Sequence, residues 1–250
     1  METAWNGVRD VFRSRIRSVL VILILGLTVA MLVTLNQIAA GIAEVNRQLQ
    51  AELSTLIEVR AAGSTAMGKG ADPLPEAIVR QLGKVPHVVK VDKFLFNRSD
   101  NPGGRFPVWV VVGMEPGKPI RVNSHGEVGT PTIFAGRGLE PDDLGRAVAV
   151  VGTVWAAEYE ARTGRPVRIG TRLTLEGSEI PRPAEVEVVG FYRAGFVFGD
   201  SQVIVPLPLA QQMTAQEGKV TNIFVTVDAV GNVEAVEQGL REALGEPWIS

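Results

Sequence analysis

Residues 135–157, AGRGLEPDDLGRAVAVVGTVWAA, contain the order of turns, strand and helix on which the fold prediction depends. Gly136 and Gly138 permit a tight turn, and Pro141 opens a loop or short turn that carries two aspartates. Residues 147–151 form a short apolar run with three valines, which is typical of a buried strand. The stretch therefore predicts a turn followed by a buried strand.

A helix is expected directly after this strand. Gly152 lets the chain turn sharply, residues 154–163 continue as a helix, and Gly164 ends it. On both sides of this unit, β-branched runs alternate with amphipathic runs. We expect strands over 55–62, 88–97, 106–114, 167–175, 184–193, 202–205 and 220–228, and helices over 74–82, 206–213 and 233–244.

This order of elements predicts an α+β fold for the large C-terminal part. Strand–helix units stand at both of its ends, around a middle section rich in strands. We therefore expect an α+β subdomain made of 55–115 and 219–250, with a β-rich inserted subdomain at 116–218. The strands over 88–97 and 106–114 should form a hairpin with a long tip.

The N-terminal part is typical of a membrane anchor. Residues 18–43 carry no charge, and as a helix they span roughly 39 Å at 1.5 Å per residue, more than a hydrocarbon core of about 30 Å. Four arginines precede this run within residues 1–17, a basic segment that the positive-inside rule places in the cytoplasm. The main domain would then be extracytoplasmic, on a single span. A cleaved signal peptide, with small residues at 39–41, is the alternative.

An apolar stripe continues the helix beyond the predicted span, so residues 44–56 are expected to form a helical stalk. Its members recur at spacings of three and four residues. Such a stripe in water needs a partner helix, although packing on its own domain is the alternative. The residues expected to contact a partner helix are Ile42, Val45, Leu49, Leu53 and Leu56.

Composition and motifs exclude several function classes. The chain has no cysteine and a net charge of −2, so thiolate chemistry and nucleic acid as a main partner are not expected. No phosphate-binding loop motif occurs, so ATP is not expected to bind here. His87 and His125 stand in different contexts, and no catalytic, cofactor or metal residue is predicted. A loop cation site at Glu140, Asp142 and Asp143 is the alternative to a helix cap.

The ordered motifs resemble the MacB-like periplasmic core domain of FtsX-type ABC transporter permeases. The basic segment and apolar helix are also similar to that family's first transmembrane helix. The similarity covers nearly the whole chain through short motifs in the family's order. These are Gly136–Arg137, Asp142 or Asp143, 147–152, Ala156 or Ala157, 164–169, 186–190 and 203–206.

The resemblance implies a membrane transport role without chemistry of its own, such as efflux across the cell membrane. It implies an ABC ATPase subunit as partner, which would bind the ATP, and a second permease copy in a homo- or heterodimer. Family permeases carry three more helices after this domain, so we expect the chain to be the front of a four-helix permease, or a split or decayed one. The alternatives are a single-span adaptor or binding protein without an ATPase, and a membrane-anchored enzyme.

Overall fold

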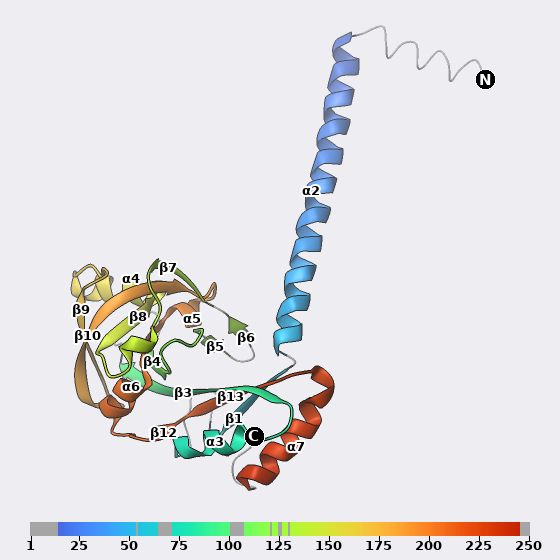
Figure 1. The fold of residues 1–250 in the computed structure, drawn as a ribbon. Coiled ribbons are helices and arrows are strands. Elements are labelled where there is room, and N and C mark those ends of the chain that lie inside the picture. Colours follow the sequence, from blue (N-terminus) through green and yellow to red (C-terminus); the bar gives the residue numbers. More distant parts are fainter. Residues whose placement is uncertain are drawn as a thin grey trace. The chain divides into compact units, whose positions relative to one another are not determined.

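The structure, a computed structural model, describes residues 15–53, 55–64, 72–100, 108–120, 122–124, 127–129 and 131–245. The chain divides into two compact units, residues 1–53 and 54–250. The first unit contains a single helix in its described part, and the second is a domain of strands and helices (Figure 1). The α+β fold class is thereby confirmed.

Helix α2 (Arg15–Leu53) runs without a break through the predicted span and most of the predicted stalk. Within it, Ser18–Ala39 is long and apolar enough to cross a membrane, by length and composition. The hydroxyls of Thr28 and Thr34 each donate to the carbonyl four residues earlier, so these groups are not left unpaired in the apolar segment. The helix ends at Leu53, and the predicted stalk end at residue 56 is therefore wrong.

The second unit is built around one large sheet. Its strands are β1 (Leu56–Arg60), β3 (Val88–Asp100), β4 (Val108–Met114), β7 (Thr132–Gly136), β8 (Val148–Gly152), β9 (Arg172–Gly177), β10 (Ile180–Arg193), β11 (Gln202–Pro206) and β13 (Asn222–Val227). Two small sheets pair β2 (Leu74–Pro75) with β12 (Lys219–Val220), and β5 (Val122–Ser124) with β6 (Glu127–Gly129).

Among the described residues, seven helical segments connect these strands. They are η1 (Glu76–Ile78), α3 (Val79–Leu82), η2 (Pro141–Asp143), α4 (Thr153–Thr163), α5 (Val197–Asp200), α6 (Leu207–Thr214) and η3 (Val230–Asn232), and the described chain closes with α7 (Val233–Leu244). The predicted helices over 154–163 and 233–244 are confirmed nearly to the residue. In α4, Gly164 adopts φ +67° and ends the helix, as its position predicts.

The large sheet has the order β1-β13-β3-β4-β11-β8-β10-β7, and β9 pairs with β10 beside this path. The predicted hairpin is confirmed, because β3 and β4 are antiparallel neighbours. β4 also pairs in parallel with β11, with Val111 opposite Val203. The expected boundary between an α+β subdomain and a β-rich insert therefore falls inside one hydrogen-bonded sheet.

Both faces of this sheet are buried. Along β4, Trp109 and Val111 belong to one hydrophobic core, whereas Val110 and Val112 belong to a second core on the other face. Residues of α3, α4, α6 and α7 cover the first core, and Phe196 and Phe198 border the second. Burying a large apolar side chain contributes about 1.5–3 kcal/mol, so this double-sided arrangement is the main source of stability.

The predicted segments and the observed ones differ in several places. Residues 74–82 begin as β2 before turning into η1 and α3, because Leu74 pairs with Val220. β9 starts at Arg172 instead of residue 167, since Gly170 adopts φ +83° and turns the chain first. β7 was not predicted, because it directly follows the Gly- and Pro-rich residues 115–131.

Candidate functional site

Helix α4 presents one aromatic and cationic face. Trp155, Tyr159 and Arg162 recur at spacings of four and three residues, so they lie on the same side of the helix. The helix begins close to α5, because a Cβ at Gly152 would lie 2.2 Å from the carbonyl oxygen of Asp200. Only glycine permits this approach, which fixes the start of α4 and therefore the position of its aromatic face.

The rings of this face pack against Trp109 of β4. Trp155 and Tyr159 stack with ring centroids 5.0 Å apart and planes inclined by 17°, and the centroid of Trp109 lies 4.8 Å from that of Trp155. The indole Nε1 of Trp109 donates to Glu158 Oε2 at 3.2 Å. Trp155 is buried and Tyr159 is half-buried, so the cluster extends from the core to the surface.

Arg162 lies over these rings at the surface. Its guanidinium carbon is 4.5 Å from the ring centroid of Trp109 and 5.8 Å from that of Tyr159. Such stacking stabilises a cation by about 0.5–1 kcal/mol at an exposed position. Within the described part of the chain, Arg162 forms no salt bridge, so it presents an unneutralised positive charge at the edge of the aromatic cluster.

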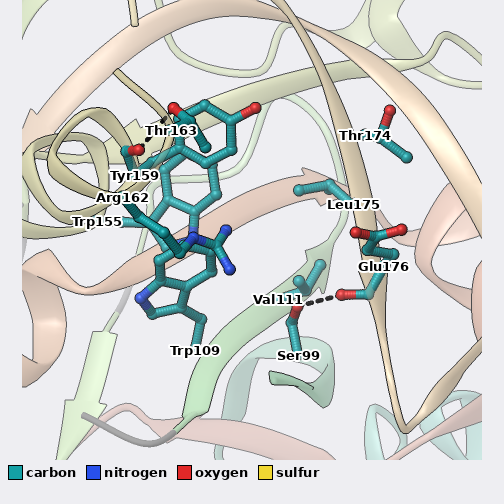
Figure 2. A pocket seen from close by; sticks show the side chains of 10 residues that line it. All are labelled: Ser99, Trp109, Val111, Trp155, Tyr159, Arg162, Thr163, Thr174, Leu175 and Glu176. Carbon is teal, nitrogen blue, oxygen red and sulfur yellow. Dashed lines mark hydrogen bonds between the residues drawn. The ribbon is translucent and has the colours of Figure 1, made fainter. Parts of the chain in front are cut away.

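A cavity of 240 Å³ opens between this cluster and strand β9. Figure 2 shows the rings and Arg162 on one side, and Thr174, Leu175 and Glu176 of β9 on the other. Between them, the buried Ser99 hydroxyl donates to the backbone carbonyl of Glu176. The arrangement offers aromatic faces, one cation and a strand edge, which are the means of binding a ligand.

The predicted alternative of a cation site at Glu140, Asp142 and Asp143 is wrong. The fully buried Asp143 is held by Arg137, whose Nη1 and Nη2 lie 2.5 Å and 2.9 Å from its carboxylate oxygens. Arg146 adds a contact at 3.3 Å, and Asp143 and Glu140 form a capping box around η2. The hydrogen bonds from Arg137 hold the pKa of Asp143 below its usual range, so the carboxylate is a structural anchor.

A second charged network joins three elements. Lys93 of β3 contacts Glu76 at 2.5 Å and Glu115 at 3.0 Å, and Gln211 of α6 donates to Glu76 at 3.0 Å. Partial burial opposes the charge of both Lys93 and Glu76, but their mutual hydrogen bond and attraction prevail. The pKa of Glu76 is therefore lowered and that of Lys93 is raised. The network ties η1 to β3 and α6, so we assign it a structural role.

Of the two histidines, the structure describes His87. The Nδ1 atom of His87 lies 2.9 Å from Asp228 Oδ2 and 3.0 Å from the side-chain nitrogen of Asn232, on an exposed turn. Hydrogen bonds from Asn232 and His87 lower the pKa of Asp228. His125 lies outside the described residues. Among the described residues, no group of three or more histidine or acidic side chains could hold a metal ion.

The predicted partner-helix residues belong to the first unit, apart from Leu56. Ile42, Val45, Leu49 and Leu53 all lie within α2, but their side chains are outside the described part of the structure. Their role as helix contacts stays a prediction. Leu56 is corrected: it is the first residue of β1, and its half-buried side chain packs against the second core of its own domain.

Sequence reasoning missed the aromatic pocket. The spacing of Trp155, Tyr159 and Arg162 was a usable signal, because it marks one face of a helix. Nothing in the sequence indicated that Trp109 would reach the same place. That contact depends on the sheet order, in which β11 lies between β4 and β8, the strand that leads into α4.

The profile of one protein family, described as MacB-like periplasmic core domain, matches residues 18–243. The chain belongs to this family. The match includes both the apolar helix and nearly all of the domain of strands and helices. The resemblance first drawn from short motifs is therefore confirmed, and the family is one of ABC transporter permease domains.

Solved structures support the same fold. The periplasmic region of MacB from Actinobacillus actinomycetemcomitans is 13% identical, with a TM-score of 0.55 over 78% of this chain and 87% of that one. The extracellular domain of the noncanonic ABC-type transporter YknZ from Gram-positive bacteria is 15% identical, with a TM-score of 0.53 over 78% of this chain and 98% of that one. A search of curated proteins found no match.

Proposed function

We propose that the chain is a membrane-anchored extracytoplasmic part of an ABC transporter permease of the FtsX/MacB type. In this role it performs no chemistry, holds a substrate or partner outside the membrane, and is coupled to a separate ATPase. The observation that carries the proposal is the family match from residue 18 to residue 243, which includes both the apolar helix and the domain of strands and helices. A second permease copy completes the assembly.

The geometry of the domain supports a binding and transmitting role. The aromatic pocket can hold a ligand. The sheet is buried on both faces and runs from β1, the first strand after α2, to β7. A rigid sheet of this kind passes displacement from one edge to the other, because packed cores are not continuously deformable.

The proposed topology can be tested with single cysteines, since the native chain has none. Glu160→Cys places a thiol on an exposed position of α4, and Thr3→Cys places one before the span. We expect a membrane-impermeant maleimide to label the Glu160→Cys variant in intact cells, and the Thr3→Cys variant only after permeabilisation. The reverse pattern would place the domain in the cytoplasm and overturn the proposal.

The coupling to an ATPase is tested by purification. A tagged chain, produced at native levels from its own locus and extracted in mild detergent, should retain a protein with a phosphate-binding loop. Variant chains that lack residues 1–53 should lose it, because the domain is then released from the membrane. A stable complex without any ATPase would instead favour the single-span adaptor.

A further inference from the structure

The cavity between α4 and β9 has the size of one large side chain. Small-molecule pockets usually measure about 300–1,000 Å³, whereas an apolar cavity of about 150 Å³ takes up benzene. The cavity here measures 240 Å³. It therefore fits an aromatic or large aliphatic side chain, with Trp109, Trp155 and Tyr159 as its apolar wall, better than it fits a complete drug-sized molecule.

A strand edge forms the opposite wall. Among the described strands, β9 pairs only with β10, so its other edge has no second strand beside it, although the Glu176 carbonyl there is already occupied by Ser99. The carbonyl of Glu176 faces this edge, because it accepts the hydroxyl of Ser99. Backbone groups two residues apart point to the same edge, so those of Thr174 also face the cavity. An extended peptide can add to such an edge through main-chain hydrogen bonds.

The positive charge of Arg162 is the third feature of the pocket. Arg162 is held over the rings of Trp109 and Tyr159 and has no acidic partner among the described residues. A guanidinium in this position is well suited to pair with a carboxylate. Arg162 would therefore favour an acidic residue in a segment whose side chain is inserted between the rings and β9.

We propose that this pocket binds an extended segment of a partner polypeptide. One aromatic or large aliphatic side chain of the segment enters the cavity, an acidic residue two positions away, on the same face of the extended segment, pairs with Arg162, and the backbone of the segment bonds to the edge of β9. The proposal rests on the proposed function in one respect, because the partner must meet the domain outside the membrane. It adds the chemistry by which that partner is recognised.

The pocket contains its own fluorescent reporters. The chain has four tryptophans, and two of them, Trp109 and Trp155, line the cavity. In a Trp5→Phe, Trp248→Phe background, indole fluorescence comes from the pocket alone. Full-length protein in detergent would be titrated with a capped six-residue peptide that has phenylalanine and aspartate near its centre, two positions apart. Binding should change the intensity or the wavelength of the emission, because the ligand contacts the two indole rings.

Three altered peptides and two protein variants separate the contributions. Replacing the phenylalanine by alanine should weaken binding about ten-fold or more, as expected for a buried aromatic anchor. Replacing the aspartate by lysine, or methylating the backbone nitrogens beside the anchor, should also weaken it. Arg162→Gln should weaken binding of the original peptide about five-fold, within the range for a partly exposed ion pair. Arg165→Gln, an exposed arginine outside the pocket, should leave it unchanged.

The outcomes separate this proposal from its rivals. Equal binding of the aspartate and lysine peptides, or equal effects of Arg162→Gln and Arg165→Gln, would overturn the role of Arg162. If N-acetylphenylalanine binds as tightly as the peptide, the site takes a small anionic molecule and the peptide proposal is wrong. None of these measurements involves an ATPase. A failure of the transporter assignment would therefore appear in the purification experiment and not in this one.

Discussion

At the scale of single residues, the Arg137–Asp143 pair explains the structural role of the Gly136–Arg137 motif. Gly136 adopts φ +70°, which turns the chain so that Arg137 reaches the fully buried Asp143. Arg137 contacts both carboxylate oxygens, and such two-point geometry is not reproduced by lysine. The ion pair therefore links the end of β7 to η2.

We predict that Asp143→Asn lowers the free energy of unfolding of residues 54–250 by about 3 kcal/mol at neutral pH, because it leaves Arg137 without its buried partner. The pKa of Asp143 is lowered in the folded state. The ionised Asp143 carboxylate therefore contributes to the free energy of unfolding above its unfolded pKa of about 3.9. This contribution is lost as the pH falls through the pKa of the folded state. Urea unfolding of both proteins at pH 7 and pH 3 measures this, and the difference between them should shrink at pH 3. A constant difference would contradict the assignment.

At the scale of elements, close backbone crossings fix how the strands meet. A Cβ at Gly190 of β10 would lie 2.0 Å from the carbonyl oxygen of Arg137, whereas a Cβ at Gly138 would meet nothing within 4 Å. We predict that Gly190→Ala destabilises residues 54–250 by about 2 kcal/mol or more through overpacking. Gly138→Ala, the matched control, should change stability by less than about 0.5 kcal/mol. Similar urea midpoints for the two variants would show that the crossing is loose.

The helices and strands also show which parts of the fold could be predicted from the sequence. The helices over 154–163 and 233–244 were predictable, because apolar periodicity and a terminal glycine or a regular stripe mark them locally. The pairing of β4 with β11 was not predictable, since parallel partners are set by the tertiary fold and not by neighbouring residues. The aromatic pocket depends on that pairing. Its α4 half was visible in the sequence, and its β4 and β9 walls were not.

At the scale of the whole molecule, we predict that α2 pairs with α2 of a second copy. The stripe at Ile42, Val45, Leu49 and Leu53 is apolar at helical spacing, and a helix with this pattern associates through it. We predict that Leu49→Cys gives a disulfide-linked dimer on oxidation in membranes, since paired stripes bring equivalent positions close together. Arg47→Cys, off the stripe, should cross-link far less.

A second pair of variants checks the same contact by weakening it. Leu49→Glu together with Leu53→Glu should reduce the dimer fraction in detergent, because charge in a helix seam is costly to desolvate. Light scattering of the purified protein measures that fraction. If the charged variant dimerises as well as the native chain, and the Leu49→Cys and Arg47→Cys yields are equal, the stripe packs elsewhere and copies associate through another surface.

The corrected end of α2 has a mechanical consequence. The helix stops at Leu53 and β1 starts at Leu56, so three peptide links join α2 to the sheet. Fully stretched, they reach about 11 Å. A displacement of α2 that exceeds this length must either separate β1 from β13 or move the entire sheet. In this molecule, a large displacement of α2 is thus transmitted to the β1 edge of the sheet.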